Sequence, residues 1–334
     1  MVKIAINGFG RIGRAAFKIA FERDDVEIVA INDLTDNATL AHLLKYDTAF
    51  GRYSHDVSGD DSGITVDGKH IRIFAEPDPT KLPWGDLDVD VVIESTGRFV
   101  KTEDAKLHIQ AGAKRVAISA PAKGEGTTTV VLGVNNNSLD DANVVFSNAS
   151  CTTNCITPPA AVIEEAFGIE KAMMTTIHSY TADQRLQDSP HKDLRRARAA
   201  AQNMVPTTTG AAKAAGLALP SLSGVFDGLS IRVPTINVSM SDFTFLLKRD
   251  VTKEEVNETF REAIKQDKWQ GILSATDEPL VSSDFMGSSF SSTVDLSLTN
   301  VVGGNLLKIV AWYDNEWGYS NRLVEMVAEV GKRI

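Results

Sequence analysis

The chain has 334 residues, which at roughly 150 residues per domain predicts about two domains, and its 43% hydrophobic and 23% charged residues are ordinary for a globular protein. The 34 Lys and Arg residues against 44 Asp and Glu give a formal net charge of −10, which argues against a general nucleic-acid or membrane-surface binder, since either needs a basic face. No apolar run reaches the roughly 18 residues of a membrane-spanning helix and the start lacks the apolar stretch of a signal peptide, while the two cysteines, Cys151 and Cys155, fit a reducing cytoplasm rather than a disulfide scaffold.

The first 150 residues alternate short apolar runs with helical stretches. We predict helices at Arg14–Arg23 and Thr102–Ala111, where apolar residues recur at helical spacing. We predict strands at six apolar runs, namely Val2–Asn7, Val26–Asn32, Val89–Glu94, Arg115–Ser119, Thr129–Val134 and Val144–Ser147. Nearly continuous apolar strands separated by helices are typical of a parallel sheet covered on both faces, so this half is predicted to be an α/β domain.

Beyond about residue 150 the strand-like runs become longer and alternate between apolar and polar residues. They lie at Lys171–Tyr180, Leu229–Val233, Val238–Lys248 and Leu306–Tyr313. Thr252–Lys265 predicts a helix with Thr252 as its N-cap, and Asn321–Val330 predicts an amphipathic helix at the C-terminus. This half is therefore predicted to be an α+β domain with a mostly antiparallel sheet.

Gly8, Gly10 and Gly13 form the pattern G-x-G-x-x-G between a predicted strand and a predicted helix. Asp33 follows 20 residues after Gly13, where an acidic residue takes the ribose hydroxyls of a dinucleotide. Glycines are needed because the backbone turns sharply, approaches the pyrophosphate and offers it the N–H groups of a helix N-terminus. Glycines that serve packing alone are the weaker alternative. We predict a Rossmann-type doubly wound domain that binds NAD rather than NADP, because Asp33 would repel a 2′-phosphate and no Arg or Lys follows it directly.

Cys151 and Cys155 stand where this domain is predicted to end. Ser150 can cap the helix that follows, which puts Cys151 in a first turn whose exposed N–H groups favour the thiolate. Pro158 and Pro159 would kink that helix or end it after one turn. No Cys/His cluster completes a metal site, so we predict no metal, and two buried structural thiols stay open as the alternative to a catalytic cysteine.

Six histidines are candidate bases for a reactive thiol. Most of them stand in polar or helical contexts and are predicted to lie at the surface; the five other than His178 are His42, His55, His70, His108 and His191. His178 differs because it ends the apolar run Met173–Ile177 in the second half. A histidine at the end of a strand can activate a thiol, although a structural role stays open for it as well.

Seven segments, taken in order, resemble the motifs of phosphorylating glyceraldehyde-3-phosphate dehydrogenases. They are Ile6–Gly13 (INGFGRIG), Ser147–Cys155 (SNASCTTNC), His178–Thr181 (HSYT), His191–Arg198 (HKDLRRAR), Pro206–Lys213 (PTTTGAAK), Arg232–Thr235 (RVPT) and Tyr313–Ser320 (YDNEWGYS). The resemblance runs from Val2 to the C-terminus without a large insertion. It implies a cytoplasmic homotetramer whose NAD-binding domain comprises residues 1–150 and 315–334 and whose catalytic domain comprises residues 151–314.

The resemblance also implies the reaction. Cys151 would attack the aldehyde of D-glyceraldehyde 3-phosphate to give a thiohemiacetal, with His178 as the base. Hydride transfer to NAD would leave a thioester, and inorganic phosphate would release 1,3-bisphosphoglycerate, a step of glycolysis and gluconeogenesis. Cys155 would have no essential catalytic role.

Three sets of binding residues follow from the same resemblance. The C3 phosphate of the substrate would be held by Thr181, Arg232 and an arginine of the Arg195–Arg196 pair, for which we choose Arg196. The attacking phosphate would be held by Ser150, Thr152, Thr209 and Gly210. Besides the three glycines and Asp33, the cofactor would contact Arg11, Ile12, Ser119, Asn315 and Tyr319. Hydroxyls, backbone N–H groups and guanidinium groups are the usual partners of phosphates.

One residue departs from the family pattern. Ser189 stands where NAD-specific members usually carry Leu in a loop that reaches a neighbouring subunit's adenosine pocket, which implies some use of NADP beside NAD.

Three other protein classes fit the sequence less well. An erythrose-4-phosphate dehydrogenase tends to lose the Thr-Gly that is intact in Thr207–Lys213, and an aspartate-semialdehyde dehydrogenase lacks HKDLRRAR and YDNEWGYS. A nucleotide-sensing or nucleic-acid-binding Rossmann protein would need neither Cys151 nor His178, and the net charge disfavours nucleic acid.

Overall fold

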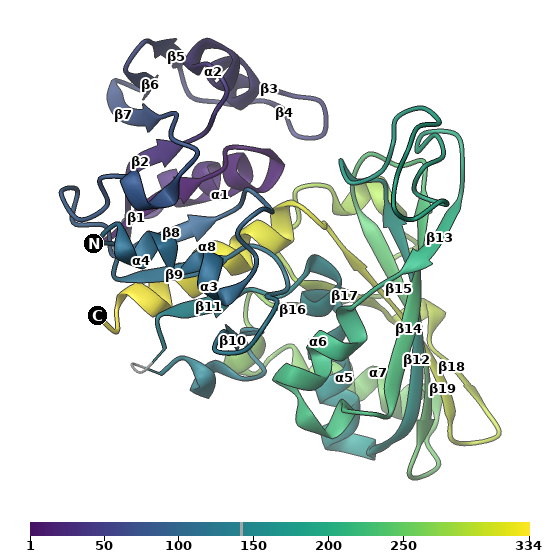
Figure 1. Cartoon of the computed structure of the whole chain (residues 1–334). Coiled ribbons are helices and arrows are strands. Elements are labelled where there is room, and N and C mark those ends of the chain that lie inside the picture. Colours follow the sequence, from purple (N-terminus) through teal and green to yellow (C-terminus); the bar gives the residue numbers. More distant parts are fainter. Residues whose placement is uncertain (141–142) are drawn as a thin grey trace. The chain divides into compact units, whose positions relative to one another are not determined.

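The computed structural model describes residues 1–140 and 143–334, which divide into two compact units. The first unit comprises Met1–Val130, Asn136–Ala149 and Ser320–Ile334, and the second comprises Val131–Asn135 and Ser150–Tyr319. Each unit is built around one large sheet (Figure 1). In the described part of the chain, no helix combines the length and the apolar character needed to cross a lipid bilayer.

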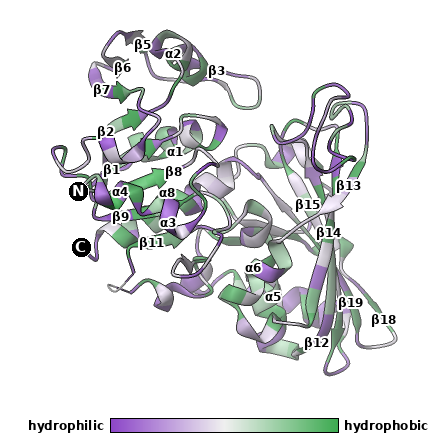
Figure 2. Cartoon of the chain, in the orientation of Figure 1, coloured by the Kyte–Doolittle hydropathy of each residue, from purple (hydrophilic) through white to green (hydrophobic). Residues whose placement is uncertain are grey.

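The sheet of the first unit is mostly parallel, as predicted. Its nine strands among the described residues run in the order β10 (Thr128–Thr129), β11 (Val145–Ser147), β9 (Arg115–Ile118), β8 (Val91–Glu94), β1 (Val2–Asn7), β2 (Val26–Asn32), β7 (Lys69–Phe74), β6 (Gly63–Val66) and β5 (Val57–Asp60). All neighbours from β10 to β7 are parallel, and β7, β6 and β5 are antiparallel. Figure 2 shows β8 as a mainly hydrophobic strand, as expected for a strand covered on both faces.

Helices and short strands complete this unit. They are α1 (Arg11–Phe21), α2 (Asn37–Lys45), α3 (Thr102–Ala105), α4 (Leu107–Gln110), most of α8 (Trp317–Gly331), and the two-stranded pair β3 (Tyr46–Asp47) and β4 (Gly51–Arg52). The helix predicted at Thr102–Ala111 is therefore two short helices. Pro79–Lys81 and Asn136–Ser138 are single 3₁₀ turns.

The strand predicted at Thr129–Val134 is wrong beyond Thr129. The chain turns back instead, since the Val134 amide donates to the Val131 carbonyl and Asn135 Oδ1 accepts from the Val131 amide at 2.8 Å. Gly133 supports this turn with a φ of +86°, which a glycine adopts without strain. The apolar run is a buried turn. A local hydrophobic pattern alone does not distinguish a buried turn from a strand.

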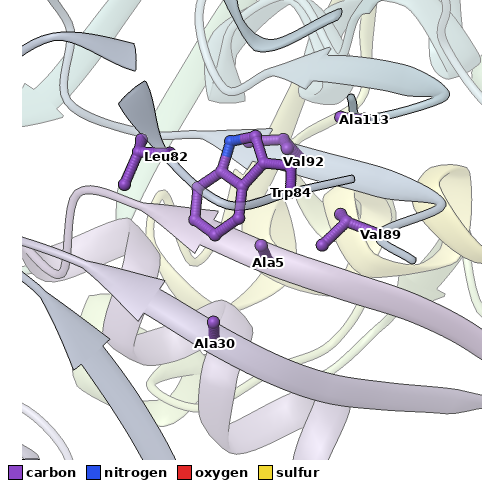
Figure 3. Packing of buried hydrophobic residues seen from close by; sticks show 7 residues of the cluster. All are labelled: Ala5, Ala30, Leu82, Trp84, Val89, Val92 and Ala113. Atoms are coloured by element: carbon purple, nitrogen blue, oxygen red, sulfur yellow. The ribbon is translucent and has the colours of Figure 1, made fainter. Parts of the chain in front are cut away.

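Trp84 lies at the centre of a buried cluster on one face of the first sheet. Its side chain is completely buried and packs with Ala5, Ala30, Leu82, Val89, Val92 and Ala113 (Figure 3). The Trp84 indole donates a hydrogen bond from Nε1 to Nδ1 of His108 at 3.0 Å. His108 is itself fully buried, and its Nε2 lies 3.0 Å from the Glu94 carboxylate.

The prediction that His108 lies at the surface is therefore wrong. Its sequence context is polar, but the short helix α4 turns the ring inward, where a carboxylate and an indole N–H satisfy both ring nitrogens. A buried imidazole is tolerated when both nitrogens have partners.

Replacing Trp84 by alanine is expected to destabilise the first unit by about 3–5 kcal/mol, because it opens a cavity in a closely packed cluster. Trp84→Phe should cost less, about 1–3 kcal/mol, because it mainly leaves Nδ1 of His108 without its donor. Urea unfolding followed by circular dichroism measures both, with Leu43→Ala as the control, since Leu43 is 38% exposed. Equal midpoints for Trp84→Ala and the control would contradict the packing argument.

The second unit is built on a mostly antiparallel sheet, also as predicted. Its strands run in the order β13 (Val205–Thr208), β14 (Phe226–Val233), β12 (Ile169–Ser179), β15 (Ser239–Leu247), β19 (Leu306–Tyr313), β17 (Ser292–Asp295) and β16 (Leu273–Thr276), with β18 (Asn300–Val302) paired to β19. Two neighbouring pairs are parallel, β12 with β14 and β16 with β17. The parallel pairing of β12 with β14 places His178 opposite Arg232.

Helices α5 (Cys151–Phe167), α6 (Ala211–Ala218) and α7 (Lys253–Ala263) belong to this unit, and α5 and α6 pack against the sheet (Figure 1). Thr252 caps α7 as predicted, since its hydroxyl accepts from the Glu255 amide at 3.1 Å. The remaining 3₁₀ turns are Pro220–Leu222, Asp267–Trp269, Ser282–Phe285 and Leu296–Leu298.

Pro158 and Pro159 do not end α5 after one turn. The helix continues through both buried prolines and ends at Phe167, followed by Gly168 as the C-cap residue with a φ of +70°. A proline inside a helix removes one intrahelical hydrogen bond, and burial of both rings in the packed interior compensates for that loss. The long helix keeps Cys151 at the start of a rigid element.

Candidate active site

Cys151 is the first residue of α5, and Ser150 caps the helix as predicted. The Ser150 hydroxyl accepts a hydrogen bond from the Thr153 amide at 3.0 Å. The Cys151 side chain is partly exposed, whereas Cys155, one turn further along the helix, is completely buried and lies 3.6 Å from the Ser292 hydroxyl. The Cys151 thiol is thus accessible from solvent, whereas the Cys155 thiol is enclosed by the protein.

His178 lies near the end of β12 and faces Cys151. Its Nε2 is 3.4 Å from the Cys151 sulfur, a distance at which a proton can pass between them. The parallel pairing of β12 with β14 sets His178 directly opposite Arg232. One guanidinium nitrogen of Arg232 lies 2.9 Å from Nδ1 of the same ring. The imidazole therefore lies between a thiol and a cation.

The environment favours neutral forms of both members of this pair. Burial lowers the pKa of His178 to about 3, and the positive charge of Arg232 acts in the same direction. Burial also raises the pKa of the Cys151 thiol, although Arg232 and the N–H of Thr152 oppose that shift. The helix N-terminus acts on the pKa of Cys151 in the predicted direction, but loss of hydration outweighs it.

Tyr313 is a member of the site that the sequence reasoning missed. Its hydroxyl lies 3.0 Å from the Thr152 hydroxyl and 2.8 Å from the Thr176 hydroxyl, and its ring meets the His178 ring edge to face at 6.0 Å. Burial raises the pKa of Tyr313 well above its ordinary value, so the phenol stays protonated. Tyr313 is the first residue of the segment YDNEWGYS, and that segment was the feature of the sequence that could have indicated it as a site residue. It packs against the ring of His178 and gives the Thr152 hydroxyl a partner within the protein.

Acid is expected to destabilise the second unit through His178. The folded chain resists protonation of the ring down to about pH 3, whereas the unfolded chain takes the proton near pH 6.5. The free energy of unfolding should therefore be unaffected by this group above pH 6.5 and fall by up to about 1.4 kcal/mol for each unit of pH below it. In urea unfolding at pH 7 and pH 5, His178→Asn should lose about 2 kcal/mol less than the unaltered chain. Equal losses would show that the ring is not protected.

The predicted phosphate-binding arginines differ in how fully their donors are used. Arg196 donates to the Thr207 hydroxyl at 2.9 Å and to the Thr208 carbonyl at 3.2 Å, and it pairs with Asp183. Arg232, by contrast, has a buried Nε without a hydrogen-bond partner among the described residues. A buried guanidinium N–H without an acceptor is costly, so Arg232 is the arginine prepared to take an anion.

The other predicted phosphate residues lie in polar turns of the same unit. The Thr209 hydroxyl accepts from the Ala211 amide at 3.2 Å, and Gly210 is the N-cap residue of α6. The Thr181 amide donates to the Gln184 side chain at 3.4 Å. Gly210 thus lies at the N-terminus of a helix, where backbone N–H groups suit an anion.

The glycine pattern of the first unit forms the turn that was predicted. Gly8 has a φ of +96°, and a Cβ there would lie 2.7 Å from the Thr96 nitrogen. A Cβ on Gly13 would lie 2.1 Å from the Gly8 carbonyl oxygen, so helix α1 could not approach β1. The Phe9 amide in this turn donates to the Asp33 carboxylate at 2.7 Å. The glycine turn therefore packs against the start of α1 and is hydrogen-bonded to Asp33.

A pocket of about 280 Å³ adjoins this turn. Three of the residues predicted to bind the cofactor, Gly8, Gly10 and Asp33, line it. Other lining residues, which the sequence reasoning did not name, include Asn32, Glu76, Ser95, Thr96, Arg98 and Phe99. They come from the carboxyl ends of neighbouring parallel strands or from the loops that follow, where nucleotides bind in such sheets. The polar residues at the end of each apolar run could have indicated these lining positions from the sequence.

The remaining predicted cofactor residues do not line this pocket. Arg11 pairs with Asp47 at 2.6 Å, Ile12 lies in the first turn of α1, and the Ser119 amide donates to the Glu94 carbonyl at 2.9 Å. The other two lie in the second unit, where the Asn315 side chain accepts from the Ser239 hydroxyl at 2.8 Å and Tyr319 is buried. Their roles stay predictions. Across the described residues, no cluster of three or more His, Cys, Asp or Glu side chains is arranged to hold a metal ion.

Comparison with known proteins identifies the family. Residues 150–315 match the family model described as glyceraldehyde 3-phosphate dehydrogenase, C-terminal domain, and residues 2–102 match the one described as glyceraldehyde 3-phosphate dehydrogenase, NAD binding domain. The chain is 56% identical to the glyceraldehyde-3-phosphate dehydrogenase of Streptomyces coelicolor over 100% of its length and 99% of that relative. The chain belongs to the glyceraldehyde-3-phosphate dehydrogenase family. Similar proteins include the enzymes of that name from Geobacillus stearothermophilus (55% identical over 99% of each chain) and Thermotoga maritima (56% identical over 97% of this chain and 98% of the relative).

Membership of the glyceraldehyde-3-phosphate dehydrogenase family confirms the resemblance drawn from the seven segments. It also confirms the predicted class, an NAD-dependent oxidoreductase, and NAD as its cofactor. The predicted fold, a Rossmann-type parallel sheet with a second, mostly antiparallel sheet, agrees with the two matched domains.

Proposed function

We propose that this chain catalyses the NAD-dependent oxidation of D-glyceraldehyde 3-phosphate with inorganic phosphate, which yields 1,3-bisphosphoglycerate and NADH. The observation that carries this proposal is the contact of 3.4 Å between the Cys151 sulfur and Nε2 of His178. Beside this pair lies Arg232, whose buried Nε has no acceptor among the described residues. A thiol, a neutral base and an anion-binding cation are the groups that oxidation of a phosphorylated aldehyde through a thioester requires.

The steps follow from the positions of these groups. The Cys151 sulfur attacks the aldehyde carbon while the thiol proton passes by way of Nε2 of His178 to the carbonyl oxygen, which gives a thiohemiacetal and leaves the ring neutral. NAD, when bound, accepts the hydride from that carbon. Loss of the hydride from the carbon and of the hydroxyl proton to Nε2 of His178 turns the thiohemiacetal into a thioester. Inorganic phosphate attacks the thioester carbonyl, and the Cys151 thiolate leaves as the acyl phosphate forms.

The two phosphates use different parts of the second unit. Arg232, with Thr181 and Arg196 beside it, holds the phosphate of the substrate; Arg232 contributes most, because Arg196 is already paired with Asp183. The attacking phosphate binds at Ser150, Thr152, Thr209 and Gly210. Because the Thr152 hydroxyl is bonded to Tyr313, we expect Thr152 to contribute chiefly its backbone N–H.

The cofactor belongs mainly to the first unit. The NAD-binding domain comprises residues 1–150 and 315–334 and the catalytic domain residues 151–314, with Gly8, Gly10, Gly13 and Asp33 holding the dinucleotide. The carboxylate of Asp33, fixed by the Phe9 amide, favours NAD over NADP, and Ser189 permits some use of NADP. The active form is a homotetramer in the cytoplasm.

A spectrophotometric assay of NADH formation tests this proposal. The purified chain is given D-glyceraldehyde 3-phosphate and NAD with and without inorganic phosphate, then with NADP in place of NAD and with erythrose 4-phosphate in place of the substrate. We expect turnover that requires phosphate, with kcat/KM highest for NAD and for glyceraldehyde 3-phosphate. Turnover without phosphate would refute the phosphorylating reaction, and a higher kcat/KM with NADP would refute the cofactor preference.

A further inference from the structure

Three neighbouring strands of the first sheet end in buried polar residues that stand side by side. In the parallel pairing of β8, β1 and β2, Asn7 is in register with Glu94 on one side and with Asn32 on the other. Nδ2 of Asn7 donates to Glu94 at 2.5 Å, and Nδ2 of Asn32 donates to Oδ1 of Asn7 at 2.7 Å. These three residues, the polar row, join the carboxyl ends of the three strands.

Glu94 accepts hydrogen bonds from all of its partners. One carboxylate oxygen accepts from the amide and the hydroxyl of Thr96, at 2.9 and 2.5 Å. The other accepts from Asn7 and, at 3.0 Å, from Nε2 of His108. A carboxyl proton needs an acceptor, and four donors leave none, so Glu94 is an ionised carboxylate.

Trp84 fixes the direction of the hydrogen bonds at one end. An indole N–H only donates, and that of Trp84 donates to Nδ1 of His108. Nδ1 therefore has a lone pair, and the neutral ring carries its proton on Nε2, where Glu94 accepts it. His108 is thus held in one tautomer between a donor and an acceptor that cannot exchange roles.

The backbone of Glu76 fixes the direction at the other end. Oδ1 of Asn32 accepts from the Glu76 amide and Nδ2 of Asn32 donates to the Glu76 carbonyl, both at 2.9 Å. A peptide group cannot exchange its donor for its acceptor. The Asn32 NH₂ group must therefore face Oδ1 of Asn7, and the Asn7 NH₂ group must face Glu94.

The polar row reaches the pocket next to the glycine turn. Four residues held by these hydrogen bonds line that pocket, namely Asn7, Asn32, Glu76 and Thr96. Asp33, which lines the pocket too, directly follows Asn32 in the chain. Glu94 and His108 are buried and act on the pocket through these neighbours.

We propose that Glu94 is a positioning residue for the cofactor, because its carboxylate sets the direction of the hydrogen bonds that hold one wall of the dinucleotide pocket. That direction passes along the polar row to the backbone of Glu76 in the loop after β7. This inference rests on the proposed function, in which Gly8 and Asp33 of the same pocket hold the dinucleotide.

Glu94→Gln keeps the shape of the side chain and turns one acceptor into a donor. In the place of one oxygen, the new NH₂ group faces the donors of Asn7 and His108. In the place of the other, it faces the amide and the hydroxyl of Thr96. The Thr96 amide cannot turn, whereas the Asn7 side chain can, so the conflict passes to Asn7.

A turn of Asn7 carries the conflict to the pocket wall. When Asn7 directs its oxygen to position 94, its NH₂ group meets the NH₂ group of Asn32. If Asn32 turns as well, it sets its NH₂ group against the Glu76 amide and its oxygen against the Glu76 carbonyl. Both bonds to Glu76 are then lost, and the loop after β7 is released from the edge of the sheet.

The experiment measures the binding of ADP-ribose to the full chain by calorimetry. ADP-ribose lacks the nicotinamide, so its affinity reports on the pocket and not on the reaction. Glu94→Gln is compared with Glu103→Gln, which makes the same chemical change on α3, where the exposed Glu103 pairs with Lys106 at 2.9 Å. Circular dichroism verifies that each variant is folded.

A double variant, Asn7→Asp with Glu94→Gln, moves the carboxylate one place along the polar row. The glutamine at position 94 then accepts from Thr96 and donates to the carboxylate at position 7. That carboxylate also accepts from Asn32 and from Nε2 of His108, which lies 3.3 Å from the terminal atom of this side chain. Every donor regains an acceptor.

We expect Glu94→Gln to raise the Kd of ADP-ribose and the KM for NAD about 10-fold, the effect of roughly one lost buried hydrogen bond. The KM for glyceraldehyde 3-phosphate and kcat at saturating NAD should change much less. Glu103→Gln should bind as the unaltered chain does, and the double variant should recover most of the loss. An unchanged Kd in folded Glu94→Gln, or a double variant as weak as Glu94→Gln, would overturn the inference.

A measurement on the unaltered chain decides the direction should the variants fail to fold. In ¹⁵N NMR with labelled histidine, a ring nitrogen that carries a proton is distinguished from one that does not. The His108 signals are assigned through the contact of the ring with the Trp84 indole proton. We expect the proton on Nε2; a proton on Nδ1 would contradict the direction and with it the role of Glu94.

The NADH assay keeps this test separate from the proposed function. Phosphate-dependent turnover together with an unchanged Kd in Glu94→Gln refutes the role of Glu94 and leaves the reaction standing. An unaltered chain that binds ADP-ribose without turnover refutes the reaction, and the Kd of Glu94→Gln still decides the role of Glu94. An unaltered chain that does not bind ADP-ribose contradicts both.

Discussion

Replacing Cys151 by serine is expected to abolish aldehyde oxidation, with a fall in kcat/KM on the order of 10⁴-fold or more. Serine is a far weaker nucleophile at neutral pH, because its hydroxyl does not ionise and His178 is a weak base in this environment. An ester in place of the thioester would also be a poorer acyl donor to phosphate. The NADH assay measures the loss, and a burst experiment shows whether any acyl enzyme forms.

Cys155→Ser is the matched control, since it makes the same chemical change four residues along the same helix. Cys155 is completely buried beside Ser292 and Ala311, and burial raises the pKa of its thiol to about 12, so it is not a nucleophile at neutral pH. Most of the activity should remain, with a loss of stability of about 1–3 kcal/mol because a hydroxyl replaces a buried thiol. Equal loss of activity in both variants would refute the assignment of Cys151 as the single nucleophile.

Replacing His178 by asparagine is expected to lower kcat by about 10²- to 10⁴-fold, the range that a general acid–base residue contributes. Asparagine can still donate a hydrogen bond towards the reacting oxygen, but it cannot take the thiol proton from Cys151. KM should change much less, because in the proposed function the substrate's phosphate is held by Arg232 rather than by the ring. Single-turnover kinetics at saturating NAD measures the acylation step directly.

The pH dependence of Cys151 alkylation supplies an independent readout for the same variant. Iodoacetamide reacts with the thiolate, so its rate against pH gives the apparent pKa of Cys151. His178→Asn should move that pKa upwards, because the thiolate loses its nearest hydrogen-bonding partner at 3.4 Å. The control is His70→Asn, since His70 is exposed in the first unit and its ring nitrogens lie near the hydroxyls of Ser62 and Thr65. An unchanged profile in His178→Asn would show that the ring does not act on the thiol.

Local sequence patterns predicted much of the fold. The apolar runs at Val2–Asn7 and Val26–Asn32 are strands with the predicted bounds, and Leu306–Tyr313 is as well. The prediction of a strand after Thr129 was wrong, because that apolar run is a buried turn. Of the two outcomes left open for the prolines of α5, an end after one turn is excluded, since the helix continues beyond them.

Part of the candidate site was also visible in the sequence. Ser150 as a cap, Cys151 in the first helical turn and the glycine turn with Asp33 are each set by residues close together in the chain, so spacing was enough to predict them. His108 shows the limit of this reasoning. Its polar neighbours indicated a surface residue, but partners from distant segments, Trp84 and Glu94, make it a core residue.

Patterns in the sequence were sufficient to predict the class of each half, the glycine turn, the capped cysteine and, through seven ordered segments, the family. The surroundings of His178, by contrast, depend on how distant strands pair. Arg232 lies beside it because β12 and β14 pair in parallel in one register, and Tyr313 lies against it because β19 runs in the same sheet. Strand register joins residues that are 54 or more positions apart in the chain, and it is set by the packing of the whole sheet rather than by any local pattern. That packing is what places one ring nitrogen between a carbonyl oxygen and a guanidinium.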